Sequence, residues 1–349
     1  MGEEKNGKSG PGCFGGGVII AAIVFAFAAI IAFPIGGLVT VSAIALESVA
    51  TSKNFDVVEE DDFPELVWER GGEKDSPTVI RFRLEDEIAF GSGGSDILGN
   101  SEPTAAERLL ATIRYARRDS EVRGLLLELD TPGGEVTAAD VIANEIREFR
   151  YSDTNRFVVV HMGSMCCSGG YYIAAAANAI VAHPTTVTGS IGVIMSTFNA
   201  AKLAEKIGVE SVAIATGGNK NMLDPLKPVE PEHLEIFRKV VASDYERFVA
   251  VVALGRSMEV DKVRAIADGR VFSAFEAKEL GLVDTIGYRD DVDGVIEELA
   301  GEEARICRYE EQTSWRSILA EAFSATGAVK PLKAAVSAAA KPRLEYRLR

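Results

Sequence analysis

Ser168 is the residue whose surroundings most clearly allow nucleophilic chemistry. It follows an apolar, β-branched run at 156–160 that is typical of a buried strand, and an alanine-rich run at 173–177 favours a helix after it. Gly169 and Gly170 allow a sharp turn and the close approach of a substrate. Amide groups at a helix start are unpaired and partly positive, so they could hold an oxyanion. The alternative is that Ser168 only caps the helix.

A serine nucleophile needs a base to accept its proton. The chain has three histidines. His161 lies in the apolar strand and is expected to be a core residue, His183 lies at a turn, and His233 begins a long helix where exposure is expected. None has an evident carboxylate partner. Lys220 stands in a glycine-rich loop from which it could reach Ser168, and burial would lower its pKa enough for it to act as a base. By itself it could equally be a surface lysine.

Strands and helices alternate along the centre of the chain. Apolar or alternating runs predict strands at 78–84, 122–130, 156–160 and 212–215, and helical patterns occur at 104–118, 136–149, 230–254, 260–267 and 274–280. Thr104 and Glu107 have the spacing of a capping box at the start of the first helix. Alternating elements with short connections predict an α/β fold with a mainly parallel sheet.

Two glycine turns follow consecutive strands of this predicted sheet. Gly133 and Gly134 come after the strand at 122–130, and the Ser168 turn comes after the strand at 156–160. Because sites in parallel sheets form beyond the carboxyl ends of strands, both turns could line one crevice. An oxyanion hole is a reasonable inference, although two unrelated tight turns remain the alternative.

Composition and charge limit the function classes. The chain has 349 residues and a net charge of −15, which argues against nucleic acid as a partner because that needs a basic patch. The four cysteines (Cys13, Cys166, Cys167 and Cys307) lack the spacing of a metal site, so no metal is predicted. Cys166 and Cys167 are adjacent in an apolar context, where packing is the expected role.

The N-terminal region predicts a membrane anchor. Residues 1–17 form a polar tail, and residues 18–46 carry no charge and are long enough to span a bilayer. A cleaved signal peptide is the alternative, but its apolar region is usually about 7–15 residues. Lys5 and Lys8 precede the apolar run, whereas acidic residues dominate the predicted linker at 47–77, so the bulk of the chain is expected outside the cytoplasm.

Four segments carry a resemblance to a known family: residues 130–134, 163–172, 188–193 and 268–272. In this order they resemble the short-form signal peptide peptidase A family, the membrane-anchored Ser–Lys proteases of the S49 type. The resemblance covers about residues 78–292. Thr131 stands where relatives commonly have serine, and Cys166 and Cys167 stand where they commonly have two alanines. Cys167 beside the serine therefore raises thiol chemistry as a minor alternative.

This resemblance implies a Clp-protease/crotonase-like fold for a protease domain at 78–300, followed by a C-terminal extension at 301–349. It implies that Ser168 is the nucleophile and Lys220 the general base, both from one protease domain, and that Ser190 hydrogen-bonds the lysine. Gly134 and Gly169 would supply the oxyanion-hole amides, with Gly133 shaping the turn. The family forms rings or domes, so a homo-oligomer is implied, and no cofactor is.

The sequence therefore predicts a membrane-anchored, extracytoplasmic serine endopeptidase. Its expected substrates are remnant signal peptides and other small apolar peptides, cleaved through an acyl-enzyme. Two other classes stay open: a crotonase-like acyl-CoA hydrolase or isomerase, and a non-catalytic membrane scaffold with the same fold. The basic, alanine-rich tail at the end of the extension is expected to be disordered.

Overall fold

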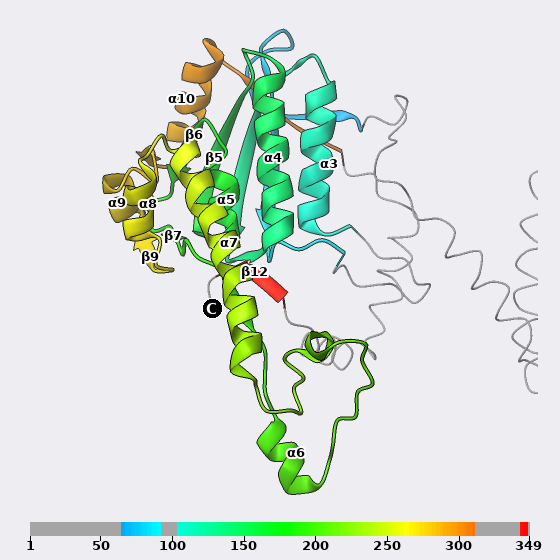
Figure 1. Ribbon diagram of the computed structural model, residues 1–349. Coiled ribbons are helices and arrows are strands. Elements are labelled where there is room, and N and C mark those ends of the chain that lie inside the picture. Colours follow the sequence, from blue (N-terminus) through cyan, green and yellow to red (C-terminus); the bar gives the residue numbers. More distant parts are fainter. Residues whose placement is uncertain (1–63, 92–102, 311–342, 348–349) are drawn as a thin grey trace, which may run out of the picture. The chain divides into compact units, whose positions relative to one another are not determined.

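The computed structural model describes residues 64–91 and 103–310, together with the backbone of residues 343–347 (Figure 1). The predicted polar tail at 1–17, the anchor at 18–46 and the linker before residue 64 lie outside the described residues. Within the described part, the helices are all too short or too polar to cross a membrane.

The centre of the fold is a mostly parallel sheet in the order β1-β11-β2-β3-β5-β6-β10, with β7 paired to β5 and β9 paired to β7. Only β1 and β9 pair antiparallel with their neighbours in this sheet. The strands are β1 (Leu66–Gly71), β2 (Thr78–Glu85), β3 (Val122–Thr131), β5 (Phe157–Cys167), β6 (Ala179–Ala182), β7 (Val187–Gly189), β9 (Val271–Ser273), β10 (Thr285–Ile286) and β11 (Arg305–Tyr309).

Both faces of the central strands are buried, because successive side chains point to opposite faces. Leu125 and Leu127 belong to a large cluster with residues of α3, α4, α5 and α7, whereas Leu126 belongs to a smaller cluster with Val292 and Ile296 of α10 (Figure 1). This two-sided cover explains why β3 is an almost continuous apolar run. The helices are α3 (Ala105–Arg118), α4 (Val136–Ser152), α5 (Gly169–Ala174), α7 (Pro231–Gly255), α8 (Val260–Ile266), α9 (Ala274–Glu279) and α10 (Arg289–Ala300).

Most predicted elements are confirmed within a few residues. The strands predicted at 78–84 and 122–130 are β2 and β3, and the helices predicted between 104 and 280 are α3, α4, α7, α8 and α9. The capping box is present: the Thr104 hydroxyl accepts a hydrogen bond from the Glu107 amide, and the Glu107 carboxylate accepts one from the Thr104 amide. The predicted α/β fold with a mainly parallel sheet is confirmed.

Two local predictions differ from the structure. The strand predicted at 156–160 continues to Cys167, so β5 ends directly before Ser168. The strand predicted at 212–215 is wrong. Val212 and Ile214 are largely exposed and the segment has no regular structure, because no neighbouring strand pairs with it among the described residues. An apolar run without a partner strand lacks the ladder that would stabilise it.

A second, small sheet has the order β4-β12-β8 and consists of β4 (Gly133–Glu135), β12 (Arg343–Arg347) and β8 (Ile194–Ser196). The expectation of disorder for the C-terminal tail is therefore wrong at residues 343–347, whose backbone pairs with two strands of the protease fold. The extension also contributes β11 to the main sheet, where it lies between β1 and β2. Residues 311–342 lie outside the described residues.

Candidate active site

Ser168 occupies the turn between β5 and α5 in a strained backbone conformation. Its φ is 53° and its ψ is −114°, values that a residue with a side chain rarely adopts. The main chain is held on both sides: the Ser168 amide donates to the Gly189 carbonyl at 2.8 Å, and the Ser168 carbonyl accepts from the Tyr172 amide at 2.8 Å. The residue is only 1% exposed. Such strain persists where surrounding contacts enforce it, and it is common at functional turns.

The glycine turn after β3 is held against Ile88. The Gly133 carbonyl accepts a hydrogen bond from the Ile88 amide at 2.8 Å, and the Ile88 carbonyl accepts one from the Glu135 amide at 2.7 Å. A Cβ at position 134 would overlap the Ile88 carbonyl, so only glycine fits there. Because Gly133 and Glu135 direct these groups to Ile88, the amide and carbonyl of Gly134 face the opposite side.

Thr131, which departs from the family pattern, keeps this turn intact. Its hydroxyl donates to the Asp86 carbonyl at 2.5 Å and accepts a hydrogen bond from the Gly133 amide at 3.1 Å. Gly133 itself has a φ of 106°, which glycine adopts without steric cost. The Thr131 side chain also lies against Gly170 of α5, where a Cβ would come within 2.7 Å of it. The two predicted turns are therefore packed against each other.

Ser190 lies beside the Ser168 turn. It follows Gly189, whose carbonyl accepts from the Ser168 amide, and it also has a positive φ, of 51°. The Ser190 amide donates to the Arg270 carbonyl at 2.7 Å, which joins this segment to the one after α8. Asp130 connects the first two resembling segments, since its carboxylate accepts a hydrogen bond from the Met165 amide at 3.0 Å. The four resembling segments therefore meet at one end of the sheet.

Lys220 lies outside this cluster. It belongs to η2 (Gly218–Asn221) in a segment that also contains α6 (Ala201–Ile207); we call residues 197–230 the arm. The arm extends away from the main sheet and α5, toward the bottom of the view (Figure 1). The Lys220 side chain is exposed and makes no ion pair or hydrogen bond with any other described residue. The structure thus brings Gly133, Gly134, Gly169 and Ser190 to Ser168, but it does not bring Lys220 there.

Comparison with known proteins assigns the family. A model of peptidase family S49 matches residues 151–303, a range that includes both Ser168 and Lys220. The chain is 35% identical over 237 residues to "Putative signal peptide peptidase SppA" of Enterococcus faecium, covering 68% of each chain. The chain belongs to peptidase family S49. Family membership makes this S49 chain a serine-type peptidase.

Other relatives extend this assignment. The S49 chain is 37% identical over 210 residues to "Serine protease SPPA, chloroplastic" of Arabidopsis thaliana, covering 58% of this chain and 31% of the relative. It is 34% identical over 217 residues to "Protease 4" of Salmonella typhi, covering 61% of this chain and 34% of the relative. The chain therefore spans about a third of the length of these two proteins.

The cysteine next to the serine is poorly suited to act as the nucleophile of this S49 peptidase. Cys167 is buried, and its thiol donates to the Val187 carbonyl at 3.4 Å. Burial raises the pKa of the Cys167 thiol to about 12, and it raises the pKa of Cys166 well above the usual value. The reactive thiolate is therefore scarce near neutral pH.

None of the three histidines forms a hydrogen bond with Ser168. His161 is half-buried on the α10 face, where burial lowers its pKa, and its Nε2 has no hydrogen-bond partner in the described part of the chain. His183 contacts Thr185 at 2.8 Å. The expectation that His233 is exposed is wrong: it is 9% exposed, with Nε2 3.7 Å from the Glu230 carboxylate. The sequence of the long helix α7 does not indicate that its first turn, which contains His233, is buried.

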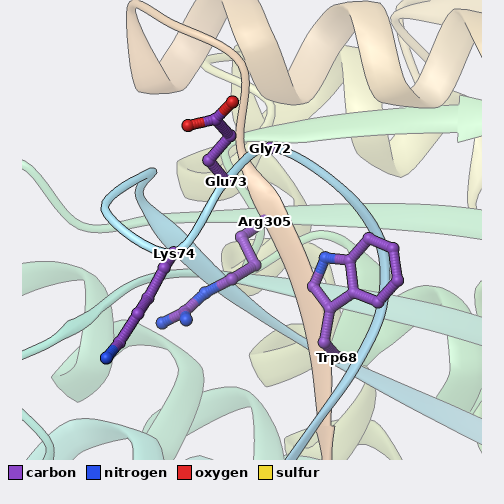
Figure 2. Close-up of a pocket in the computed structure, with 5 residues that line it drawn as sticks. All are labelled: Trp68, Gly72, Glu73, Lys74 and Arg305. Carbon is purple, nitrogen blue, oxygen red and sulfur yellow. The ribbon is translucent and has the colours of Figure 1, made fainter.

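A shallow pocket lies at the opposite end of the sheet from Ser168 (Figure 2). It is lined by Trp68, Gly72, Glu73, Lys74 and Arg305, near the amino ends of β2 and β11. Ligand sites of parallel sheets form at the carboxyl ends instead. For this reason we do not assign the pocket to catalysis.

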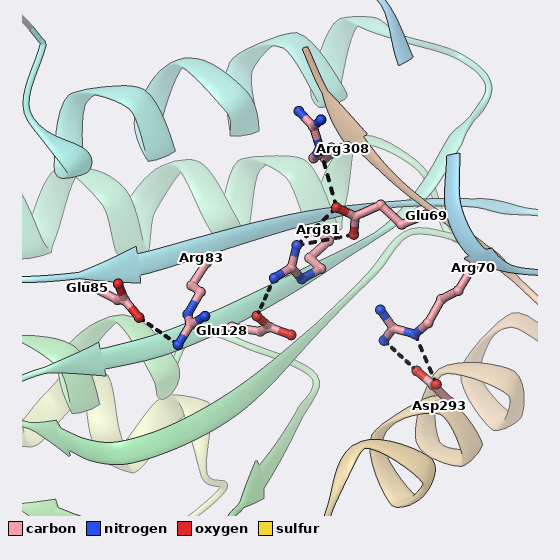
Figure 3. A network of polar contacts seen from close by, with 8 residues as sticks. All are labelled: Glu69, Arg70, Arg81, Arg83, Glu85, Glu128, Asp293 and Arg308. Carbon is pink, nitrogen blue, oxygen red and sulfur yellow. Dashed lines mark hydrogen bonds and ion pairs between the residues drawn. The ribbon is translucent and has the colours of Figure 1, made fainter. Parts of the chain in front are cut away.

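A network of ion pairs covers the α10 face of the sheet (Figure 3). Arg81 lies between Glu69 at 3.1 Å and Glu128 at 2.9 Å, and Arg70 pairs with Asp293 of α10 at 2.8 Å. The Arg81 guanidinium lowers the pKa of Glu128 against the opposing effect of burial. These groups compensate one another's charge, which is the usual requirement for burying them. Their role is structural.

Proposed function

We propose that this S49 peptidase cleaves remnant signal peptides and other small apolar peptides, with Ser168 as nucleophile and Lys220 as general base. The observation that carries the proposal is the Ser168 turn. A buried serine is held in a strained conformation at the end of a parallel strand, with Gly169 opening a helix directly after it. Helix-start amides lack intrahelical partners and can stabilise an oxyanion.

The proposed reaction has two halves. Neutral Lys220 takes the proton from the Ser168 hydroxyl, whose oxygen attacks the peptide carbonyl, and the Gly134 and Gly169 amides hold the resulting oxyanion. When the intermediate collapses, the C–N bond breaks and the protonated lysine gives its proton to the leaving amine. Water, deprotonated by the same lysine, then attacks the acyl-enzyme; the ester bond to Ser168 breaks, and the protonated lysine returns the proton to the Ser168 oxygen. Ser190 orients the lysine, and Gly133 sets the direction of Gly134.

A homo-oligomer would supply what the single chain lacks around Lys220. A lysine base must lose contact with water for its pKa to fall, but Lys220 is exposed in one chain. The arm also exposes large apolar side chains, with Phe198 79% exposed, Val212 82% exposed and Ile214 fully exposed. Apolar groups gathered on one protruding segment are typical of a protein interface. Packing of the arm against another copy would bury them together with Lys220.

The proposed membrane attachment depends on the sequence alone. Residues 18–46 are uncharged and long enough for one span, and acidic residues follow them. We propose a single-pass anchor with the catalytic domain outside the cytoplasm. Full-length protein should remain in the pellet after alkaline extraction of membranes, and protease added outside sealed cells should digest the catalytic domain. Release by alkali would contradict the anchor.

Activity against a fluorogenic, apolar signal-peptide-like substrate tests the catalytic proposal. We expect full-length protein in detergent to lose activity with Ser168→Ala and with Lys220→Ala, and to keep it with Cys167→Ala. Between pH 6 and 10 the activity should rise with one ionisation below the usual lysine pKa of about 10.4. If Cys167→Ala alone were inactive, the nucleophile would be the thiol.

Two other function classes are separated by simple controls. A crotonase-like acyl-CoA hydrolase would cleave members of a thioester panel that the peptidase leaves intact. A non-catalytic scaffold would fold normally, yet it would neither cleave peptides nor react with an active-site serine probe. The described residues contain nothing that favours either class over peptide hydrolysis.

A further inference from the structure

One carboxylate, that of Asp140, connects three helices near the proposed catalytic pair. It belongs to the second turn of α4, and its Oδ1 accepts a hydrogen bond from the Tyr172 hydroxyl of α5 at 2.6 Å. The Arg247 guanidinium of α7 binds both oxygens of the same carboxylate, with Nε 2.9 Å from Oδ1 and Nη2 2.8 Å from Oδ2. The roles assigned to the Ser168 turn do not use this cluster.

Tyr172 connects the carboxylate to the turn that holds the proposed nucleophile. Its amide donates to the Ser168 carbonyl at 2.8 Å, and its fully buried ring packs against Phe248 of α7, with 5.0 Å between the ring centroids. Burial and the hydrogen bond to Asp140 raise the pKa of the Tyr172 hydroxyl, so the hydroxyl keeps its proton and remains a donor. Hydrogen bonds therefore connect Ser168, through Tyr172, to Asp140.

The helix that bears Arg247 is held mainly at its carboxyl end. Apart from His233 in the first turn, the buried residues of α7 are Phe248, Val249, Val251, Val252 and Ala253. At the end of the helix, a Cβ on Gly255 would overlap the Ala175 carbonyl at the end of α5. In Figure 1, α7 runs past α5 and continues beyond the sheet toward α6. Arg247 thus lies where α7 leaves the core.

The angle of α7 at Arg247 determines where the arm lies. Residues 231–247 span about 24 Å at a rise of ~1.5 Å per residue, so a tilt of about 5° would move the start of α7 by about 2 Å. The arm, which carries Lys220, ends directly before that point. Because a misplacement of about 1 Å at a catalytic group can cost on the order of 10²-fold in rate, small changes of this angle matter for Lys220.

We propose that Asp140 is a positioning residue, which binds Tyr172 and Arg247 together and so fixes the direction of α7 and the arm relative to the Ser168 turn. This inference rests on the proposed function, in which Lys220 is the base, and it adds a residue that acts on that base through α7. Two parallel contacts from an arginine to a carboxylate fix an orientation as well as a distance. The side chains of Asp140 and Arg247 are 27% and 52% exposed, so their ion pair contributes little to folding stability.

Arg247→Gln in the full-length protein in detergent tests this inference, because it removes the paired contact at an exposed position. We expect kcat to fall about 10–100-fold, KM to stay within about twofold, and the melting temperature to stay within about 3 °C of that of the wild type. Wild-type kcat in this variant would overturn the proposal.

Glu246→Gln is the matched control. Glu246 is the preceding residue of α7, it is 54% exposed, and it pairs with Arg264 of α8 at 2.8 Å. Because α8 follows α7 after a short connection and Glu246 does not bind α4 or α5 through this ion pair, we expect wild-type kcat. Equal losses in Glu246→Gln and Arg247→Gln would show that charge on α7 matters rather than the contact with Asp140, and would overturn the proposal.

A double variant shows whether Asp140 and Arg247 act together. Asp140→Asn keeps an acceptor for the Tyr172 hydroxyl but removes the charge that binds Arg247. It should lower kcat as much as Arg247→Gln does, and combining the two substitutions should cause no further loss, because residues that share one interaction are not additive. Losses that multiply in the double variant would overturn the coupling.

A distance measurement reports the direction of the arm without requiring activity. Spin labels are attached through Lys206→Cys in α6 and Tyr151→Cys in α4, both at exposed positions, in a chain that also carries Cys13→Ala. The other three cysteines are buried. Dilution with unlabelled protein keeps the measured pairs within one chain. We expect Arg247→Gln to broaden the distance distribution and Glu246→Gln to leave it unchanged.

The same measurement separates this inference from the catalytic proposal. An unchanged distribution in Arg247→Gln would overturn the positioning role of Asp140, whatever the activity. If the distribution broadened as expected while Lys220→Ala kept full activity, Asp140 would still fix the direction of the arm, but Lys220 would not be the base. The proposed function would then fail, and the placement of α7 by Asp140 would stand.

Discussion

The turn around Ser168 and the arm that carries Lys220 differ in how they are fixed. Ser168 is buried, and its main chain is held by hydrogen bonds to Gly189 and Tyr172. Lys220 is exposed in a short 3-10 helix, where its amide bonds only to the nearby Gly217 carbonyl at 3.1 Å. One half of the proposed pair is positioned by the fold of a single chain. The other half is exposed in the single chain.

The difference has a chemical meaning. An oxyanion hole works because its donors are in place before the reaction, so a rigid, buried turn suits the nucleophile. A lysine acts as a base near neutral pH where burial disfavours its charged form. Under the proposed function, the single chain would be inactive until another copy covers Lys220. The predictions below test each side of this comparison.

The largest expected loss of activity is at Ser168, in the buried turn. Ser168→Ala should reduce kcat/KM by on the order of 10³-fold or more, because the nucleophile is lost while the substrate still binds. Ser164→Ala, at an exposed serine of the same strand, is the control and should be fully active. Peptide hydrolysis measures both, and thermal unfolding should show both variants folded. A Ser168→Ala protein with most of its activity would remove this residue from the mechanism.

On the arm, Lys220→Ala should lower kcat by about 10²–10⁴-fold, the usual contribution of a general base. Lys227→Ala, at another exposed lysine of the arm, should have no such effect. Rate profiles between pH 6 and 10 add a second readout, since the ionisation below the usual lysine pKa should disappear only in Lys220→Ala. Equal losses in both variants would point to arm charge rather than to a base.

A smaller loss is expected for Gly134→Ala, since a Cβ there overlaps the Ile88 carbonyl and forces the turn to move. Losing one oxyanion donor costs about 10²–10³-fold in kcat, and overpacking should lower the free energy of unfolding by about 1–3 kcal/mol. Gly217→Ala, in open space on the arm, is the control. Denaturant unfolding and kinetics measure the two effects separately. Normal kcat in a destabilised Gly134→Ala protein would contradict the oxyanion role.

Ile214→Ser tests whether the arm depends on a second copy. The side chain is fully exposed, so the change should shift the unfolding free energy of the single chain by only about 0.5 kcal/mol. We expect a smaller particle by analytical ultracentrifugation in detergent, with activity falling in parallel. Leu254→Ser, at an exposed leucine of α7, is the control. If particle size stayed the same, Ile214 would not belong to an interface.

The smallest effect is expected at Cys167. Cys167→Ala should retain activity, and the wild-type thiol should resist alkylation near pH 7. Burial raises its pKa from 9 to about 12, so between these values the folded chain keeps a proton that the unfolded chain releases. Stability should therefore fall as pH rises through this range, and less steeply in Cys167→Ala. Rapid alkylation at neutral pH would show that the thiol is accessible.

Local sequence patterns were sufficient for several elements around the Ser168 turn, although β5 continues to Cys167, beyond its predicted end. The apolar runs of β2 and β3, the capping box of α3 and the glycine turns are short-range features, so their periodicity and residue types predicted them. The resemblance of four segments then indicated which turn holds the proposed nucleophile. The S49 assignment by comparison agrees with this family.

Long-range partners could not be predicted in the same way. Ile88, which brackets Gly134, carries no local signal of its role, and neither does the Arg270 carbonyl that holds Ser190. The apolar run at 212–215 has the composition of a strand, but it pairs with no other strand in the part of the chain that the structure describes. The tail at 343–347 has the composition of a polar terminus, but its backbone pairs with two strands, β4 and β8. Strand formation depends on a neighbour whose position the local sequence does not contain.

The position of β11 determines when the main sheet of this protein can be completed. β11 lies between β1 and β2, and Arg305 donates to the Thr78 hydroxyl at 2.6 Å although 227 residues separate them. During synthesis, one edge of β2 stays unpaired until the ribosome has synthesised β11, which ends at residue 309. Open strand edges recruit other chains. A nascent chain halted before β11 would therefore be prone to aggregate, although every residue of the Ser168 turn had already been made.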